Sequence, residues 1–212
     1  LAKQNRSLGV SDRELIKIAV KSMGLDELKP FVPQEKIIEY QLETNQQAPL
    51  IAMNLRDFAE ETASESPAPG GGSIAAYMGS LGASLATMVA NLSSHKRGWD
   101  ARWEEFSNYA VEGKQYYNAL LKKVDEDTEA FNRIMAAFGL PKGTVEEKEQ
   151  RSAAIQQATK LAIQVPFETM KLAYGSMDMI KAMADIGNPN SVSDAGVGAL
   201  AARAAVIGAY LN

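Results

Sequence analysis

Two short stretches of this sequence carry residue types that could take part in chemistry. The first is 66–73, which reads SPAPGGGS and leads directly into a long apolar segment. Its consecutive glycines allow backbone conformations that are closed to other residues, and Ser73 can cap the helix that follows. The first N–H groups of a helix lack internal partners and lie at the positive end of its dipole. We therefore expect this loop to bind a group with negative charge or hydrogen-bond acceptors; a flexible linker is the alternative interpretation.

The second candidate is Asp127, because it interrupts an apolar pattern. Apolar and small residues recur at alternating spacings of four and three, which predicts a long helix with one seam that faces a partner. The seam consists of Trp99, Trp103, Phe106, Ala110, Gly113, Tyr117, Leu120, Val124, Asp127, Phe131, Ile134 and Phe138. An ionised carboxylate buried alone costs several kcal/mol. Asp127 is therefore expected either to pair with a neighbouring helix or to act as an acid or base in a cleft.

The elements that would position these residues are all helical. The hydrophobic pattern predicts helices at 11–24, 55–64, 74–92, 99–138, 144–186 and 195–211, and no strand of useful length. Capping boxes are expected at Ser11, Thr144 and Ser191, each with a carboxylate three residues later, and a kink is expected at Pro166. The fold class is therefore all-α, a bundle of long antiparallel helices.

Composition excludes several classes of function. The 212 residues carry a formal net charge of −4 with no basic cluster, so nucleic acid is not an expected partner. No cysteine is present, which excludes disulfides and thiolate metal sites and fits the cytoplasm. The single histidine, His95, rules out multi-histidine metal sites and is expected at a solvated helix end. No charge occurs between Glu65 and His95, but the polar and glycine residues within that segment favour a buried helix over a membrane span.

Five pieces of the sequence together resemble one known family. They are SPAPGGGS at 66–73, VDEDTEAF at 124–131, the LPK turn at 140–142 followed by EEK, the Val165-Pro166 pair, and GNPNSVSD at 187–194. The chain resembles the cyclodeaminase domain of formiminotransferase-cyclodeaminase and its stand-alone bacterial relatives, which include methenyltetrahydrofolate cyclohydrolases.

The resemblance also divides the chain. Residues 54–212 correspond to the cyclodeaminase-like helical domain, 1–40 resemble the end of a formiminotransferase domain, and 41–53 form a linker. Because family members continue past 209–212, we expect this domain to lack its last helical segment and the chain to be a fragment or shortened form.

The resemblance implies a folate enzyme, an ammonia lyase that cyclises 5-formimidoyltetrahydrofolate to 5,10-methenyltetrahydrofolate in histidine degradation. Asp127 matches the proposed catalytic aspartate of the family. Other residues are expected to contact the folate: the glycine loop lines its cleft, a second turn faces that cleft, and a lysine steers the glutamate tail. These are Gly70, Gly71, Gly72, Ser73, Asn188, Asn190, Ser191, Asp194 and Lys123. The reaction transfers no hydride, so no metal or redox cofactor is expected.

Two other functions remain open from the sequence. One is the hydrolysis of methenyltetrahydrofolate, and the other is a non-catalytic helical module for dimerisation. Segments 74–92 and 195–211 are apolar on too many faces for a lone small bundle. We therefore expect a homodimer or a higher even oligomer, with a formiminotransferase domain as a possible partner and no membrane contact.

Overall fold

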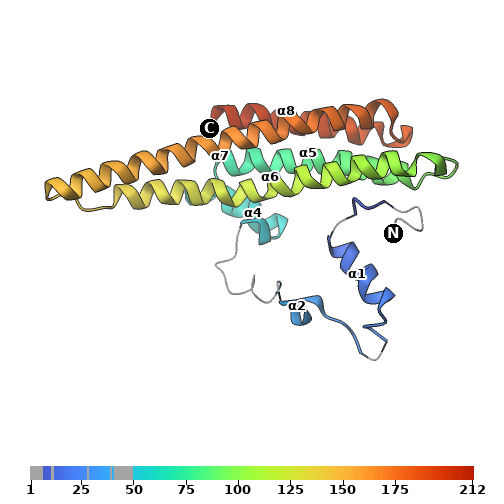
Figure 1. The fold of residues 1–212 in the computed structure, drawn as a ribbon. Coiled ribbons are helices and arrows are strands. Elements are labelled where there is room, and N and C mark those ends of the chain that lie inside the picture. Colours follow the sequence, from blue (N-terminus) through green and yellow to red (C-terminus); the bar gives the residue numbers. More distant parts are fainter. Residues whose placement is uncertain (1–6, 11, 28, 39, 41–49) are drawn as a thin grey trace.

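Four long helices form an antiparallel bundle in the computed structural model, which describes residues 7–10, 12–27, 29–38, 40 and 50–212. They are α5 (Gly71–Ser94), α6 (Trp103–Phe138), α7 (Val145–Ile186) and α8 (Val192–Leu211). Each helix runs opposite to the one before it (Figure 1). No strand occurs among the described residues, so the all-α prediction is confirmed.

Shorter elements precede and connect these helices. They are α1 (Asp12–Ser22), α2 (Pro33–Lys36), η2 (Leu50–Ala52), α4 (Leu55–Thr62), η3 (Asp100–Arg102) and η4 (Pro189–Ser191). Gly24 has a φ of 65°, a conformation that stops α1 as predicted. The expected capping box at Ser11 and most of the expected linker at 41–53 lie outside the described residues.

Small residues allow α5 to pack closely against α6 and α8. A Cβ added to Gly82 would lie 2.8 Å from the carbonyl oxygen of Gly198, and one added to Gly79 would lie 3.2 Å from the Cβ of Ala205. Gly71–Ser94 and Pro189–Leu211 are both long and apolar enough to cross a membrane by length and composition alone. However, 61% of the first window is buried inside the bundle, as in the core helix of a water-soluble protein.

The seam of α6 is buried as predicted only as far as the start of α5. Phe106, Leu120 and Val124 are fully buried, whereas Phe131 and Phe138 are exposed. The reason is visible in Figure 1: the end of α6 and the beginning of α7 continue beyond the start of α5 and the end of α8 as a two-helix arm. The bundle thus narrows from four helices to two next to Asp127.

Two of the three expected helix starts can be compared with the structure. At Thr144 the capping box is present, with Thr144 and Glu147 bonded reciprocally. The capping box expected at Ser191 is wrong, because Ser191 is buried without a capping bond and Asn188 instead accepts from the Asn190 N–H to start η4. Pro166 lies inside α7, which continues through it.

Candidate active site

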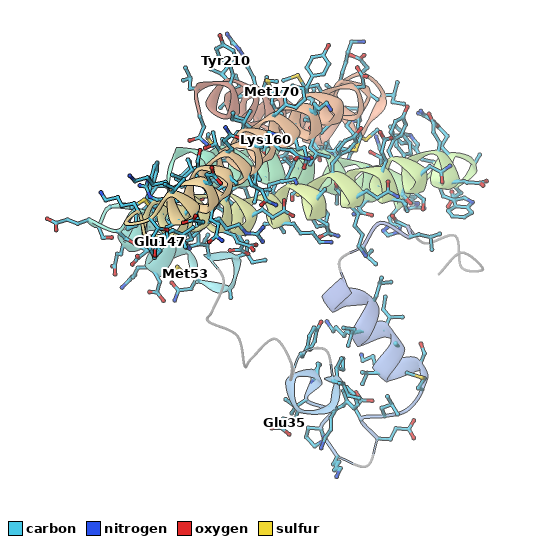
Figure 2. All side chains as sticks on the ribbon, turned by 60° about the vertical axis from the view of Figure 1, so that its left-hand side comes forward. Glu35, Met53, Glu147, Lys160, Met170 and Tyr210 are labelled. Atoms are coloured by element: carbon cyan, nitrogen blue, oxygen red, sulfur yellow. The ribbon has the colours of Figure 1, made fainter. Side chains whose placement is uncertain are left out.

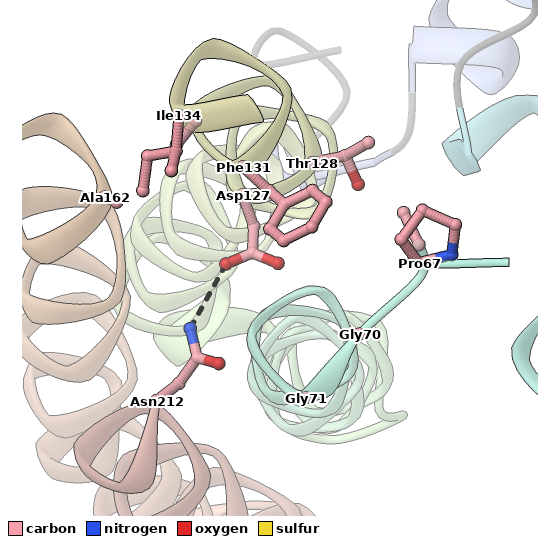
Figure 3. Close-up of a pocket in the computed structure, with 11 residues that line it drawn as sticks. Pro67, Gly70, Gly71, Asp127, Thr128, Phe131, Ile134, Ala162 and Asn212 are labelled. Atoms are coloured by element: carbon pink, nitrogen blue, oxygen red, sulfur yellow. Dashed lines mark hydrogen bonds between the residues drawn. The ribbon is translucent and has the colours of Figure 1, made fainter. Parts of the chain in front are cut away.

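A pocket of about 290 Å³ lies at the narrowing of the bundle, where the start of α5 meets α6 (Figure 3). One wall is the loop and first turn that lead into α5, another is α6, and α7 and the end of α8 complete it. The lining residues are Pro67, Ala68, Gly70, Gly71, Asp127, Thr128, Ala130, Phe131, Ile134, Ala162 and Asn212. The structure therefore brings the glycine loop and the seam carboxylate into one site.

Asp127 is held by hydrogen bonds from two other helices. The Ser73 hydroxyl of α5 donates to its Oδ2 at 2.8 Å, and the Asn212 amide, at the end of α8, donates to its Oδ1 at 3.4 Å. Figure 3 shows the carboxylate directed between the start of α5 and Asn212. Because Asp127 is only partly buried and lines the pocket, it is both oriented by the protein and open to a ligand.

Gly72 gives the carboxylate its space. A Cβ added to Gly72 would lie 2.0 Å from Asp127 Oδ1, whereas one added to Gly71 would meet only Asn212 Oδ1 at 3.8 Å. Among the glycines that the structure describes, positive φ occurs only at Gly24 and Gly98. The expectation that these loop glycines adopt conformations closed to other residues is therefore wrong. Glycine is required at position 72 because the Asp127 carboxylate lies against the backbone there.

The sequence predicted that Ser73 caps α5, and this prediction is wrong. The helix begins at Gly71 with Gly70 as its N-cap, so Ser73 already lies inside the first turn, fully buried. The first turn of α5 contains no acidic residue of its own. Asp127 of α6 instead supplies the negative charge that the positive end of the helix favours.

The second predicted turn lies far from this pocket. The Asn188 N–H donates to Ser93 Oγ at 2.8 Å, which places the turn at the C-terminal end of α5. With a rise of 1.5 Å per residue, that end is about 30 Å from Gly72. The expectation that one cleft of a single chain is faced by both turns is wrong. Substrate contact by this turn stays a prediction, for Asn188, Asn190, Ser191 and Asp194 alike.

Lys123 is committed to two carboxylates and does not line the pocket. Its Nζ bonds Glu126 at 2.6 Å and also bonds Glu168 of α7, and its side chain is 12% exposed. Burial lowers the pKa of Lys123, but the hydrogen bonds from its ammonium to both glutamates outweigh burial and leave the pKa raised. The bond from Lys123 lowers the pKa of Glu168. Steering of a glutamate tail by Lys123 stays a prediction.

Sequence reasoning missed several residues of the site. Asn212 and Ala162 lie far from Asp127 in sequence, and no local pattern pointed to either. Asp125, two residues before Asp127, does not line the pocket but accepts a hydrogen bond from the Leu50 N–H at 2.8 Å. Burial raises the pKa of Asp125, and the hydrogen bond from Leu50 offsets part of that rise. No group of three or more metal-binding side chains occurs in the part of the chain that the structure describes.

Comparisons with known proteins decide the family. Residues 54–212 match the family model described as formiminotransferase-cyclodeaminase. This chain belongs to the formiminotransferase-cyclodeaminase family. Residues 1–43, which we call the leader, match the formiminotransferase domain. This agrees with the resemblance of residues 1–40 to the end of such a domain. The formimidoyltransferase-cyclodeaminase of Gallus gallus is 38% identical over 99% of this chain, which spans only 39% of that relative.

Two further relatives each match about three quarters of this chain. The methenyltetrahydrofolate cyclohydrolase of Methylorubrum extorquens is 37% identical over 74% of this chain and 76% of its own. The crystal structure of formiminotetrahydrofolate cyclodeaminase from Thermotoga maritima has a TM-score of 0.64 at 27% identity and covers 75% of both chains. The family membership and the bundle fold therefore agree.

Proposed function

We propose that this chain carries formimidoyltetrahydrofolate cyclodeaminase activity, forming 5,10-methenyltetrahydrofolate and ammonia at the Asp127 pocket. The family membership supports the reaction class. The observation that carries the location is the convergence of Ser73, Asn212 and the start of α5 on one carboxylate that lines a pocket.

Asp127 would move the proton that the cyclisation requires. N10 of the folate attacks the carbon of the protonated formimidoyl group, and a C–N10 bond forms. Asp127 accepts the N10 proton and then donates it to the amino group of the tetrahedral adduct. The C–NH₂ bond breaks, ammonia leaves, and the methenyl cation remains beside the regenerated carboxylate. The charge balances without a redox cofactor or a metal.

The other groups around the pocket would prepare that carboxylate. The Ser73 hydroxyl fixes the orientation of Oδ2 and leaves the pocket side of the carboxylate available. Phe131 and Ile134 supply apolar walls that favour a pterin ring and exclude water from the adduct.

Hydrolysis of methenyltetrahydrofolate is the second candidate, because the Methylorubrum extorquens relative has that name. It would use the same carboxylate to activate a water molecule. The formiminotransferase match at 1–43 favours cyclodeamination, since a formiminotransferase domain joined to the bundle would supply the formimidoyl group. Gly72 argues against a purely non-catalytic module, because its lack of a side chain leaves room for the Asp127 carboxylate that lines the pocket.

The activity test follows the absorbance of methenyltetrahydrofolate. With 5-formimidoyltetrahydrofolate, the full chain should produce absorbance together with ammonia, and Asp127→Asn should lower turnover by about a hundredfold or more. The melting curve should stay cooperative, because the asparagine amide has the shape of the carboxylate and, being neutral, costs less to bury. Glu129→Gln is the control, since Glu129 pairs with Arg133 on the exposed side. Near-normal turnover in Asp127→Asn would remove the catalytic assignment.

We also propose that the chain forms a homodimer through the outer face of α8. Large apolar side chains gather on that face, and Figure 2 shows Tyr210 pointing away from the bundle. The exposed set is Val192, Val197, Leu200, Ile207, Tyr210 and Leu211. Such a set of exposed apolar side chains on one face of a helix is typical of a surface that a partner covers.

A further inference from the structure

Residues 7–10 lie against the bundle, in a groove between the C-terminal part of α5 and the first half of α6. Ser7 is fully buried, although serine usually lies at the surface. Its hydroxyl donates to Asn91 Oδ1, and its N–H donates to His95 Nε2 at 3.0 Å. A buried serine with both donors satisfied indicates a specific seat for this residue.

The same groove binds the backbone of the next three residues. The Leu8 N–H donates to Ser107 Oγ at 3.0 Å. Asn91 Nδ2 donates to the Gly9 carbonyl at 3.3 Å, and Lys114 Nζ donates to the Val10 carbonyl at 3.1 Å. Polar side chains of α5 and α6 therefore satisfy donors and acceptors along the whole segment.

Gly9 makes the fit selective for sequence. A Cβ added there would lie 2.3 Å from both the carbonyl carbon and the Cβ of Ala110, which is itself fully buried in α6. Neither atom belongs to a flexible side chain that could move aside. The groove thus accepts serine at position 7 and only glycine at position 9.

The segment belongs to the leader, not to the helical domain. Residues 1–43 match the formiminotransferase domain, whereas Asn91, Ser107 and Lys114 fall within 54–212. Beyond residues 7–10, α1 and α2 stand apart from the bundle, as Figures 1 and 2 show from two directions. After the leader, the chain contacts the bundle again at Leu50, whose N–H bonds Asp125.

We propose that the groove formed by Asn91, His95, Ser107 and Lys114 is a docking site that fastens the transferase-like leader to the cyclodeaminase-like bundle. Its occupant is the Ser-Leu-Gly-Val segment of the same chain. The site lies at the end of α5 remote from Asp127, so the leader is attached away from the candidate active site. This assignment is independent of the proposed reaction, because it concerns only how two parts of the chain are joined.

Hydrogen exchange of the full 212-residue chain tests the docking site. The amides of Leu8 and Gly9 should be protected, because their N–H groups are bonded to Ser107 Oγ and Ser7 Oγ. Gly9→Ala should accelerate their exchange by at least about tenfold, since the new methyl group expels the segment. Protection within α6 should remain. The control is Gly196→Ala, where an added Cβ meets nothing within 4 Å.

A distance measurement provides a second readout. Because the chain has no cysteine, fluorophores can be placed specifically with Lys17→Cys on α1 and Asn108→Cys on α6. Energy transfer should report a broader range of distances after either Gly9→Ala or the groove variant Asn91→Ala. Unprotected amides in the unaltered chain, or full protection in both variants, would overturn the proposal.

Discussion

The Oδ1 atom of Asp127 occupies the space in which a side chain on Gly72 would begin, 2.0 Å from an ideal Cβ at that position. The next residue, Ser73, donates a hydrogen bond to the other carboxylate oxygen. Two consecutive residues of α5 thus fix the carboxylate, one by lacking a side chain and the other by its hydroxyl group.

Gly72→Ala should therefore lower turnover sharply. The methyl group must displace the Asp127 carboxylate, and a displacement of about 1 Å can cost about a hundredfold in rate. Gly71→Ala is the matched control in the same turn, because its Cβ would meet only Asn212 Oδ1 at 3.8 Å. The comparison requires steady-state rates and a melting curve for both variants. Equal rates would show that contact with Gly72 does not position the carboxylate.

Ser73→Ala should lower kcat by roughly tenfold to a hundredfold and change KM little. The variant removes the 2.8 Å hydrogen bond to Asp127 and leaves the helix start intact. Ser80→Ala is a suitable control, since Ser80 is a buried serine of the same helix whose hydroxyl bonds the Tyr117 carbonyl instead. A similar loss of kcat in both variants would point to packing of α5 as the cause.

Glu168→Gln should reduce the free energy of unfolding by about 0.5 to 1 kcal/mol at neutral pH, the range for a partly exposed ion pair. Lys123 holds the pKa of Glu168 below its ordinary value of 4.5. The stabilisation is therefore complete above that value and disappears as the pH falls through the lowered pKa. Denaturant unfolding at several pH values should show the difference from the unaltered chain vanish in acid.

Asp185→Asn serves as the comparison for that ion pair. Its bridge to Lys181 is 3.2 Å long and far more exposed, so little change is expected at any pH. Equal effects of both substitutions would mean that Lys123 gains nothing from its burial between α6 and α7.

Leu200→Glu should convert the proposed homodimer to a monomer. Leu200 is 65% exposed on the outer face of α8, and a carboxylate there would introduce a charge into the proposed interface. Val145→Glu is the control. Val145 is equally exposed, at 65%, but lies on the arm, so its substitution should leave association unchanged. Sedimentation at micromolar concentration distinguishes the two species. A monomer before any substitution would contradict the proposal.

The long helices were predictable because each has a strong periodic pattern. The seam from Phe106 to Val124 is buried as its spacing indicated. The sequence left open whether Asp127 bonds a neighbouring helix or faces a cleft, and in the structure it does both. The exposure of Phe131 was not predictable, since it depends on where α5 and α8 end beside α6. That information is tertiary and leaves no periodic signal in the seam itself.

The glycine loop shows the same division between local and tertiary information. The composition of the loop predicted that it lies at a helix start, but not which of its glycines contacts the carboxylate. Three identical glycines differ only in what faces them, and the carboxylate that faces Gly72 comes from α6. Likewise, Asn188 and Gly70 each directly precede a helix, and their separation follows only from the length of α5.

The narrowing of the bundle beside Asp127 has a consequence for how the chain can tolerate insertions. Whole helical turns could be added to the tip of the arm without moving the carboxylate, because the tip has neither α5 nor α8 beside it. One residue inserted in α5 between Ser73 and Gly79 is a different matter. It would rotate Ser73 by about 100° relative to the rest of the helix. The hydroxyl would then leave Asp127, so the rotational phase of this helix start is fixed while the length of the arm is free.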